Sequence, residues 1–246
     1  MRNFRIVLQY EGTKYQGWQK QESTDNTIQG KLESILTKMA GTEVEVHGAG
    51  RTDAGVHAKG QVAHFKLDTK KAEMEILQYL NRYLPEDIAV ISIKEVAERF
   101  HARLNATGKI YQYRIVNSDI PHVFDRKYVH VVDKPLDLNK MKQASNMLIG
   151  SHDFKAFTST KKGKKSTIRC IETIDIDKSG DEIILTYKGD GFLYHMVRIL
   201  SGTLIEVGLS ERSVESVQSA LESLDRKNAG FLAPAKGLTL VEVFYH

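Results

Sequence analysis

The sequence predicts an α+β fold made of two similar halves, and three observations lead to this prediction. Apolar residues alternate with others from Phe4 to Tyr10, which is the period of a strand with one buried face. Apolar residues then recur at helical spacing over 28–39, with Thr27 as a cap and Gly41 as the stop. A second series of strand and helix patterns starts at Lys109.

The first half follows the order β-α-β-β-α-β, which is typical of ferredoxin-like folds. Its first strand and helix are followed by two strands on either side of a polar loop, then a helix that ends before Pro85, then a last strand. The elements expected here are strands at 4–10, 44–46, 63–67 and 88–93, and helices at 28–39 and 76–84.

The second half shows the same alternation of elements, although no repeat is visible residue by residue. We place the boundary after residue 104, which gives an N-terminal half of 1–104 and a C-terminal half of 105–246. The elements expected here are strands at 111–115, 128–132, 174–176, 183–187 and 238–244, and helices at 138–148, 196–207 and 214–224.

Composition limits the classes of protein that fit. The chain has 246 residues, is 41% hydrophobic and carries a formal net charge of +4, which suits a substantial core with a mildly basic surface. Cys170 is the only cysteine, so disulfides within the chain and cysteine-rich zinc sites are excluded. No apolar run is long enough to span a membrane and no signal-peptide pattern is visible, so we expect a cytoplasmic protein.

A glycine-rich loop in the first half is the leading candidate for chemistry. Residues 48–57 read Gly-Ala-Gly-Arg-Thr-Asp-Ala-Gly-Val-His, with Arg51 and Asp53 two positions apart. Glycines let a loop adopt left-handed turns and let a ligand approach its backbone. A carboxylate beside a guanidinium stays ionised, as a nucleophilic or basic Asp requires. The alternative is a structural pair that braces a tight turn, and such pairs outnumber catalytic ones.

Two segments of the second half combine aromatic and cationic residues. Tyr111 lies in Lys-Ile-Tyr-Gln-Tyr-Arg at 109–114, which suits base stacking with phosphate contact or an ordinary half-buried strand. Arg198 ends the segment 191–198 among apolar helix positions, so we expect it near or within the core. A buried guanidinium needs a partner, for which Asp53 is a candidate; the alternative is an arginine that reaches solvent from the helix edge.

Basic residues also crowd into one stretch of the second half. Such a cluster attracts phosphate groups and gives salt-dependent binding, or it forms a solvated loop. The residues are Lys155, Lys161, Lys162, Lys164, Lys165 and Arg169.

Several common catalytic patterns are absent from the sequence. It contains no P-loop, no Gly-x-Ser-x-Gly elbow and no Cys-x-x-Cys pair of the kind that zinc deaminases use. His47, Asp53, His57 and His64 do not form an ordered pattern of metal ligands such as His-Glu-x-x-His, so we expect no metal site.

Together these segments resemble the TruA family of tRNA pseudouridine synthases. The resemblance covers nearly the whole chain, its motifs stand in the family's order, and a small departure such as Leu104 removes no motif residue. The motifs are Tyr-Glu-Gly-Thr at 10–13, Gly-Trp-Gln at 17–19, Gly-Arg-Thr-Asp-Ala-Gly-Val-His-Ala at 50–58, Leu-Pro-Glu-Asp-Ile at 84–88, Phe-His-Ala-Arg at 100–103, Lys-Ile-Tyr-Gln-Tyr at 109–113, His-Asp-Phe at 152–154, the segment that ends at Arg198, and Ala-Pro-Ala-Lys-Gly-Leu at 233–238.

The resemblance implies that the protein isomerises uridine to pseudouridine at nucleotides 38, 39 and 40 of the tRNA anticodon stem-loop. It implies a homodimer without cofactor or metal, and two ferredoxin-like halves that share one continuous antiparallel sheet flanked by helices, with the active cleft between them. The essential carboxylate would be Asp53, acting either as a nucleophile at C1′ or as a base toward the 2′ proton. Arg198 and Arg51 would orient it, while Tyr111 would stack on the uracil and could take the C5 proton.

The same resemblance implies that further cations hold the RNA. Arg103 of the Phe-His-Ala-Arg motif is one candidate, and the other substrate-binding candidates are Arg51, Tyr111, Lys161, Lys162, Lys164 and Lys165. The target base is normally stacked, so it must flip out to reach a catalytic carboxylate.

Three other functions remain open. A non-catalytic RNA-binding or tRNA-folding protein would keep the basic surface and the aromatic residues without needing Asp53. An RNA-recognition module with aromatic residues on an open sheet would not require the glycine-flanked Arg-Thr-Asp run. A nucleoside hydrolase would release free uracil, which product analysis would detect.

Overall fold

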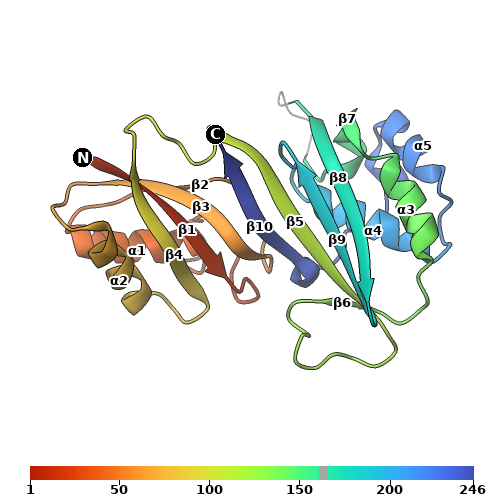
Figure 1. Ribbon diagram of the computed structural model, residues 1–246, viewed down its shortest axis with the longest axis horizontal. Coiled ribbons are helices and arrows are strands. Elements are labelled where there is room, and N and C mark those ends of the chain that lie inside the picture. The colour runs from red at the N-terminus through yellow and green to blue at the C-terminus, as the bar shows by residue number, and fades with distance from the viewer. Residues whose placement is uncertain (161–165) are drawn as a thin grey trace. The chain divides into compact units, whose positions relative to one another are not determined.

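A computed structural model describes residues 1–160 and 166–246 and divides the chain into two compact units (Figure 1). Unit 1 comprises Met1–Thr107 and Thr239–His246, and unit 2 comprises Gly108–Leu238. Each unit consists of mostly antiparallel strands with helices packed against them, which is the α+β class that the sequence predicts.

Unit 1 has the β-α-β-β-α-β order expected from the sequence. Its strands run in the order β4-β1-β3, with β2 pairing on β3, and all of these pairings are antiparallel, as in a ferredoxin-like sheet. The elements are β1 (Arg2–Tyr10), α1 (Ile28–Ala40), β2 (Val46–Gly48), β3 (His57–Leu67), α2 (Glu73–Tyr83) and β4 (Ile88–Val96).

The last strand of the chain, β10 (Leu238–Tyr245), packs in unit 1 although it follows the second series of elements in sequence. Thr239 lies opposite His57 and Leu240 lies opposite Ala58, in a parallel pairing with β3. Gly60 of β3 allows this approach, because a Cβ there would lie 2.3 Å from the carbonyl oxygen of Val241.

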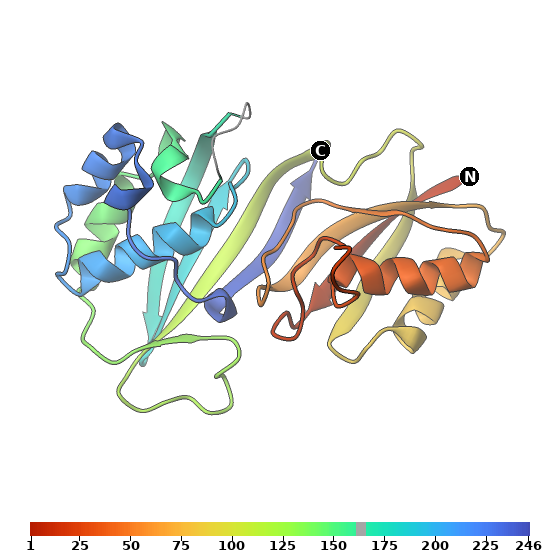
Figure 2. The ribbon, with the colours of Figure 1, turned by 180° about the vertical axis from the view of Figure 1, so that it is seen from behind.

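The first helix begins and ends where its capping residues predict. The Thr27 hydroxyl accepts a hydrogen bond from the Gly30 N–H, and Gly41 closes the helix in a left-handed conformation at φ 72°. Helices α1 and α2 contact each other and cover the same face of the unit 1 sheet (Figure 2). The fully buried core between them includes Phe4, Ile6, Leu8, Ile28, Leu32, Leu36, Ile76 and Leu80.

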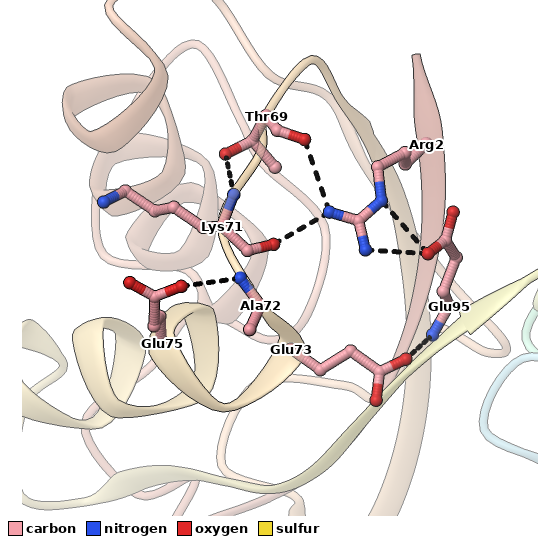
Figure 3. A network of polar contacts seen from close by, with 7 residues as sticks. All are labelled: Arg2, Thr69, Lys71, Ala72, Glu73, Glu75 and Glu95. Atoms are coloured by element: carbon pink, nitrogen blue, oxygen red, sulfur yellow. Dashed lines mark hydrogen bonds and ion pairs between the residues drawn. The ribbon is translucent and has the colours of Figure 1, made fainter.

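The start of β1 is tied to α2 by a polar network at the surface (Figure 3). Arg2 donates to Glu95 of the neighbouring strand β4 and to the carbonyls of Thr69 and Lys71, in the loop that precedes α2. Glu73 in turn accepts a hydrogen bond from the Glu95 N–H at 2.6 Å. These bonds connect the two strands with the N-terminus of α2.

Unit 2 repeats part of this order. Its elements β5, α3, β8, β9 and α4 follow the sequence β-α-β-β-α, and the strand order β5-β9-β8 corresponds to β1-β3-β2 of unit 1. The elements are β5 (Ala106–Asn117), β6 (His130–Val132), α3 (Leu138–Asn146), β7 (Gly150–Asp153), η1 (Phe154–Phe157), β8 (Ile168–Ser179), β9 (Glu182–Gly189), α4 (Met196–Gly208), α5 (Ser216–Ser223), η2 (Arg226–Asn228) and η3 (Ala235–Gly237).

Helices α3 and α4 contact each other on one face of the unit 2 sheet, with α5 in the same layer (Figure 2). Every helix and strand predicted for this half is present, whereas β7 and the 3₁₀ helix η1 were not predicted. Both are only four residues long, too short to show a period. Tyr113, Tyr187 and Phe154 are fully buried and form much of the core.

Candidate active site

The loop that carries Asp53 connects β2 to β3 in unit 1. Main-chain hydrogen bonds, within the loop and with the segment after β1, hold it in place. The Trp18 N–H donates to the Thr52 carbonyl at 3.0 Å, and the Gly55 N–H donates to the Tyr15 carbonyl at 3.2 Å. The Val56 N–H returns to the Asp53 carbonyl at 3.2 Å, so Asp53 begins a tight turn. Its side chain is half-buried.

Glycines let the segment after β1 interlock with this loop. Gly17 has φ 91°, and a Cβ there would lie 2.7 Å from the Thr52 carbonyl oxygen. A Cβ on Gly12 would lie 2.0 Å from the Val56 carbonyl oxygen. Real Cβ atoms do not approach so closely, so each position requires glycine. Gly12 and Gly17 are therefore both needed for the close packing of this segment against the loop.

Trp18 supports the loop from its β2 side. The indole is 2% exposed, and a Cβ on Gly48 would lie 2.5–2.7 Å from its ring. Tyr10 lies beside Trp18, with ring centroids 6.4 Å apart. The only tryptophan of the chain is therefore a packing residue, which the sequence alone left undecided.

The two arginines predicted in unit 1 are both exposed. Arg51 stands in the loop itself, two residues before Asp53. Arg103 lies beyond β4, next to Ala102, which is fully buried and donates its N–H to Nδ1 of His64 at 3.1 Å. Both side chains are therefore accessible from solvent.

Tyr111 lies on β5 in unit 2 and is 8% exposed. It faces Tyr187 across the β5–β9 pairing, and its ring meets the edge of Phe192 with centroids 5.3 Å apart at 85°. Phe192 belongs to the segment 191–198, so two of the sequence motifs meet here. The Phe192 contact was not predicted, since nothing in the local pattern pairs these rings.

Arg198 lies in the first turn of α4 and is half-buried, as its apolar neighbours predict. Its Nε donates to the Ala233 carbonyl at 2.8 Å, and the Ala233 N–H returns to the Arg198 carbonyl at 3.3 Å. Ala233, the first residue of the Ala-Pro-Ala-Lys-Gly-Leu motif at 233–238, thus bonds to both the side chain and the backbone of this arginine.

The turn that leads into α4 has an unusual backbone. His195 has φ 64° although it is not glycine, and its Nδ1 lies 2.9 Å from the Ser159 hydroxyl oxygen. The Thr158 hydroxyl donates to the Tyr194 carbonyl at 2.9 Å. Positive φ at a non-glycine residue costs free energy and often marks a functional segment. Sequence alone gave no sign of it.

The structure thus places the predicted residues in two groups: Arg51, Asp53 and Arg103 in unit 1, and Tyr111 and Arg198 in unit 2. Lys161, Lys162, Lys164 and Lys165 lie outside the described residues. Over 1–160 and 166–246, no three His, Cys, Asp or Glu side chains are grouped so that they could hold a metal ion. Within the same ranges, no helix has the length and apolar character needed to cross a membrane.

Comparisons with known proteins give consistent matches along the chain. The family model for tRNA pseudouridine synthase matches residues 6–105 and 144–246. A tRNA pseudouridine synthase A from Bacillus sp. (strain KSM-64) is 49% identical, over 98% of this chain and 98% of its own length. A tRNA pseudouridine synthase A 2 from Bacillus cereus is 44% identical, over 99% of each chain.

Among solved structures, one from a Cbf5-Nop10-Gar1 complex aligns with 96% of this chain and 48% of its own, at 12% identity and a TM-score of 0.39, which is too weak a similarity to bear on the fold. The two relatives cover nearly the whole chain, and the family model covers the loop of Asp53 and the helix of Arg198. The chain therefore belongs to the tRNA pseudouridine synthase family.

Proposed function

We propose that the protein isomerises uridine to pseudouridine at nucleotides 38, 39 and 40 of the tRNA anticodon stem-loop. Membership of the tRNA pseudouridine synthase family is the observation that carries this proposal. The interlocked loop adds physical support, because it holds a half-buried carboxylate at a fixed point on a rigid strand connection. The enzyme would act in the cytoplasm, as a homodimer and without a cofactor.

Asp53 is the proposed catalytic carboxylate. The reaction breaks the N1–C1′ bond, turns the uracil, forms a C5–C1′ bond and releases the C5 proton, while N1 takes up a proton from solvent. A carboxylate can attack the electron-poor C1′, as in retaining glycosidases, or remove the 2′ proton to give a glycal. Both routes remain open. Arg198 and Arg51 would orient Asp53 and balance its charge.

Tyr111 is the proposed second catalytic residue. Its aromatic ring would stack on the uracil once the base has flipped out of the stem-loop, and its phenol could take the C5 proton. The edge contact with Phe192 supports this role, since it restricts the ring to one orientation. In the proposed sequence of steps, the Asp53 carboxylate first acts on the sugar, and the Tyr111 phenol then acts on the base.

Binding of the RNA backbone is assigned to exposed cations. Arg51 and Arg103 would contact phosphates, together with Lys161, Lys162, Lys164 and Lys165 of the segment outside the described residues. Each phosphate that is neutralised releases counterions, so affinity falls as salt rises. Changing the four lysines to glutamine should weaken binding and flatten its salt dependence, whereas an unchanged slope would leave that segment as a solvated loop.

The test uses anticodon stem-loop transcripts with tritium at uracil C5. Wild-type protein should release tritium without added metal or nucleotide, and Asp53→Asn should release none while binding RNA with nearly unchanged affinity. Asp68→Asn is the matched control, because Asp68 is an exposed carboxylate just beyond the end of β3. Its release should equal that of wild type.

Each other result has a distinct meaning. Release by Asp53→Asn near the wild-type rate would remove this carboxylate from the chemistry. Tight RNA binding without release by wild type would favour a non-catalytic RNA-binding protein, and free uracil among the products would indicate a hydrolase. Light scattering of the pure protein tests the homodimer, with the mass of one 27.8 kDa chain as the result that would contradict it.

A further inference from the structure

A buried chain of hydrogen bonds lies behind the Asp53 loop and begins at Gln61 of β3. The Gln61 side chain is fully buried. Its Nε2 donates to the Gly50 carbonyl at 3.0 Å, and its Oε1 accepts from the Val62 N–H at 3.2 Å. Because a carbonyl cannot donate and an N–H cannot accept, these two bonds together fix the orientation of the amide.

The hydrogen bonds continue from Gln61 to Tyr10 and Thr52. Nε2 of Gln61 also points to the Tyr10 hydroxyl at 3.4 Å and can only donate to it. The Tyr10 hydroxyl in turn lies 2.8 Å from the Thr52 hydroxyl, and either group can be the donor in this bond. Burial raises the pKa of Tyr10 to about 12.

The chain ends on the residue before Asp53. Thr52 is 6% exposed, and its hydroxyl bonds to that of Tyr10 while its carbonyl accepts from the Trp18 N–H at 3.0 Å. Gly50 and Thr52, which stand on either side of Arg51, are thus both held by one continuous set of bonds that starts on β3. Two anchors so close to Asp53 leave its backbone little freedom.

We propose that Gln61, Tyr10 and Thr52 are positioning residues that fix the Asp53 carboxylate for its reaction with the target nucleotide. This inference rests on the function proposed above. Well-placed reacting groups account for a large share of catalysis, and a shift of about 1 Å can lower the rate about 100-fold. None of the three residues needs to touch the RNA to act in this way.

The first experiment removes one oxygen from the chain with Tyr10→Phe. We expect kcat for tritium release to fall about 10- to 100-fold while KM for the stem-loop changes less than about 3-fold. Backbone amides of Trp18 and Gly55, which join the loop to the segment after β1, should exchange with solvent faster than in wild type.

Tyr245→Phe is the matched control. Tyr245 belongs to the same unit and its hydroxyl donates to the Ala102 carbonyl at 2.6 Å, so the change also removes one bonded phenol oxygen. We expect Tyr245→Phe to keep the wild-type kcat and the wild-type exchange of the Trp18 and Gly55 amides, even where its thermal midpoint falls as much as that of Tyr10→Phe.

A rescue pair at Thr52 separates position from packing. Thr52→Val keeps the shape of the side chain but cannot form the hydrogen bond with Tyr10, whereas Thr52→Ser keeps the hydroxyl and loses a methyl group. The proposal predicts that the serine variant retains most of kcat and that the valine variant falls with Tyr10→Phe. Packing alone predicts the reverse order.

The outcomes distinguish this inference from the function on which it rests. No tritium release by wild type overturns the proposed function and the positioning role with it. Wild-type release together with an unchanged kcat in Tyr10→Phe, or with equal losses in Tyr10→Phe and Tyr245→Phe, overturns the positioning role alone.

Discussion

The two segments that carry the proposed catalytic residues differ in the residues that adopt their unusual backbone. In unit 1, the loop of Asp53 packs against glycines that have no room for a side chain, and both main-chain and side-chain hydrogen bonds hold it. In unit 2, the turn before Arg198 is also held by both kinds of bond, from the Thr158 hydroxyl and the Ser159 N–H to the Tyr194 carbonyl, but it contains a non-glycine residue at positive φ. The first segment should therefore be sensitive to an added Cβ, whereas the second carries backbone strain that a glycine would relieve.

After the loss of Asp53, the largest expected effect concerns the chemistry assigned to unit 2. Tyr111→Phe should still bind and stack but should lower kcat about 10²- to 10⁴-fold, which is the usual contribution of a positioned acid or base. Tyr79→Phe, a matched loss of one phenol oxygen on α2, should leave kcat unchanged. Tritium release measures both, and an undiminished rate in Tyr111→Phe would show that the phenol is not an obligatory base.

Gly17→Ala tests the interlocked loop of unit 1. The new Cβ would lie 2.7 Å from the Thr52 carbonyl oxygen, on a backbone at φ 91°. We expect a loss of about 2–4 kcal/mol in the free energy of unfolding, from the left-handed backbone and the overpacking together. Denaturant titration measures this loss, and kcat should fall as well because the loop is displaced.

Gly41→Ala is the control that isolates the backbone contribution. Gly41 also has positive φ, at 72°, but a Cβ there meets nothing within 4 Å. The free energy of unfolding of Gly41→Ala should fall by about 1 kcal/mol, with kcat unchanged. Equal losses of unfolding free energy in Gly17→Ala and Gly41→Ala would mean that the close contact with Thr52 does not contribute to the loss. The loop would then be able to move away from the added Cβ.

The difference between these two glycines also shows what sequence can reveal. The helix that ends at Gly41 was predicted from local signals, namely its apolar spacing, Thr27 and the glycine itself, and the structure confirms it. The need for Gly17 depends on the carbonyl of Thr52, a residue far along the chain, which no local pattern reports. The pairing of β10 with β3 was missed for the same reason.

The positioning residues were missed although a signal existed. Tyr10 continues the buried alternation of β1, and Gln61 shares the alternate positions of Ala63 and Phe65 on β3. A glutamine at such a position must find partners, since an unpaired buried amide is costly. The sequence could therefore indicate that Gln61 is bonded, but its partners, Gly50 and Tyr10, come only from the fold.

A third prediction concerns acid, which should weaken unit 1 through His64. Burial lowers the pKa of His64 to about 4, helped by the nearby charges of His101, His47 and Lys66. The centroid of its imidazole ring lies 4.6 Å from that of His101 and 5.1 Å from that of His47. Between pH 6.5 and about 4 the unfolded chain binds the proton that the folded chain refuses, so stability falls as pH falls through this range.

His64→Gln tests this dependence. A glutamine carbonyl can still accept the Ala102 N–H, which now bonds to Nδ1 of His64. The variant should lose less thermal stability than wild type between pH 7 and pH 5, by a difference of about 2–4 °C in the midpoint. Parallel curves for the two proteins would assign the acid sensitivity to other groups, such as His101, whose pKa burial also lowers.

The smallest effect is expected at the strained turn of unit 2. His195→Gly relieves the left-handed backbone at φ 64° but removes the contact of Nδ1 with Ser159. These contributions oppose each other and are each about 1 kcal/mol, so the free energy of unfolding should change by less than about 1 kcal/mol.

His195→Ala keeps the strain and loses the contact, so it should be less stable than His195→Gly by about 1 kcal/mol. Denaturant titration of the two variants therefore measures the backbone strain directly, since both lack the imidazole. Equal stability would mean that alanine is accommodated at this φ without strain. The turn before Arg198 would then tolerate a side chain at positive φ, in contrast to Gly17 beside the loop of Asp53, where a Cβ would lie 2.7 Å from the Thr52 carbonyl oxygen.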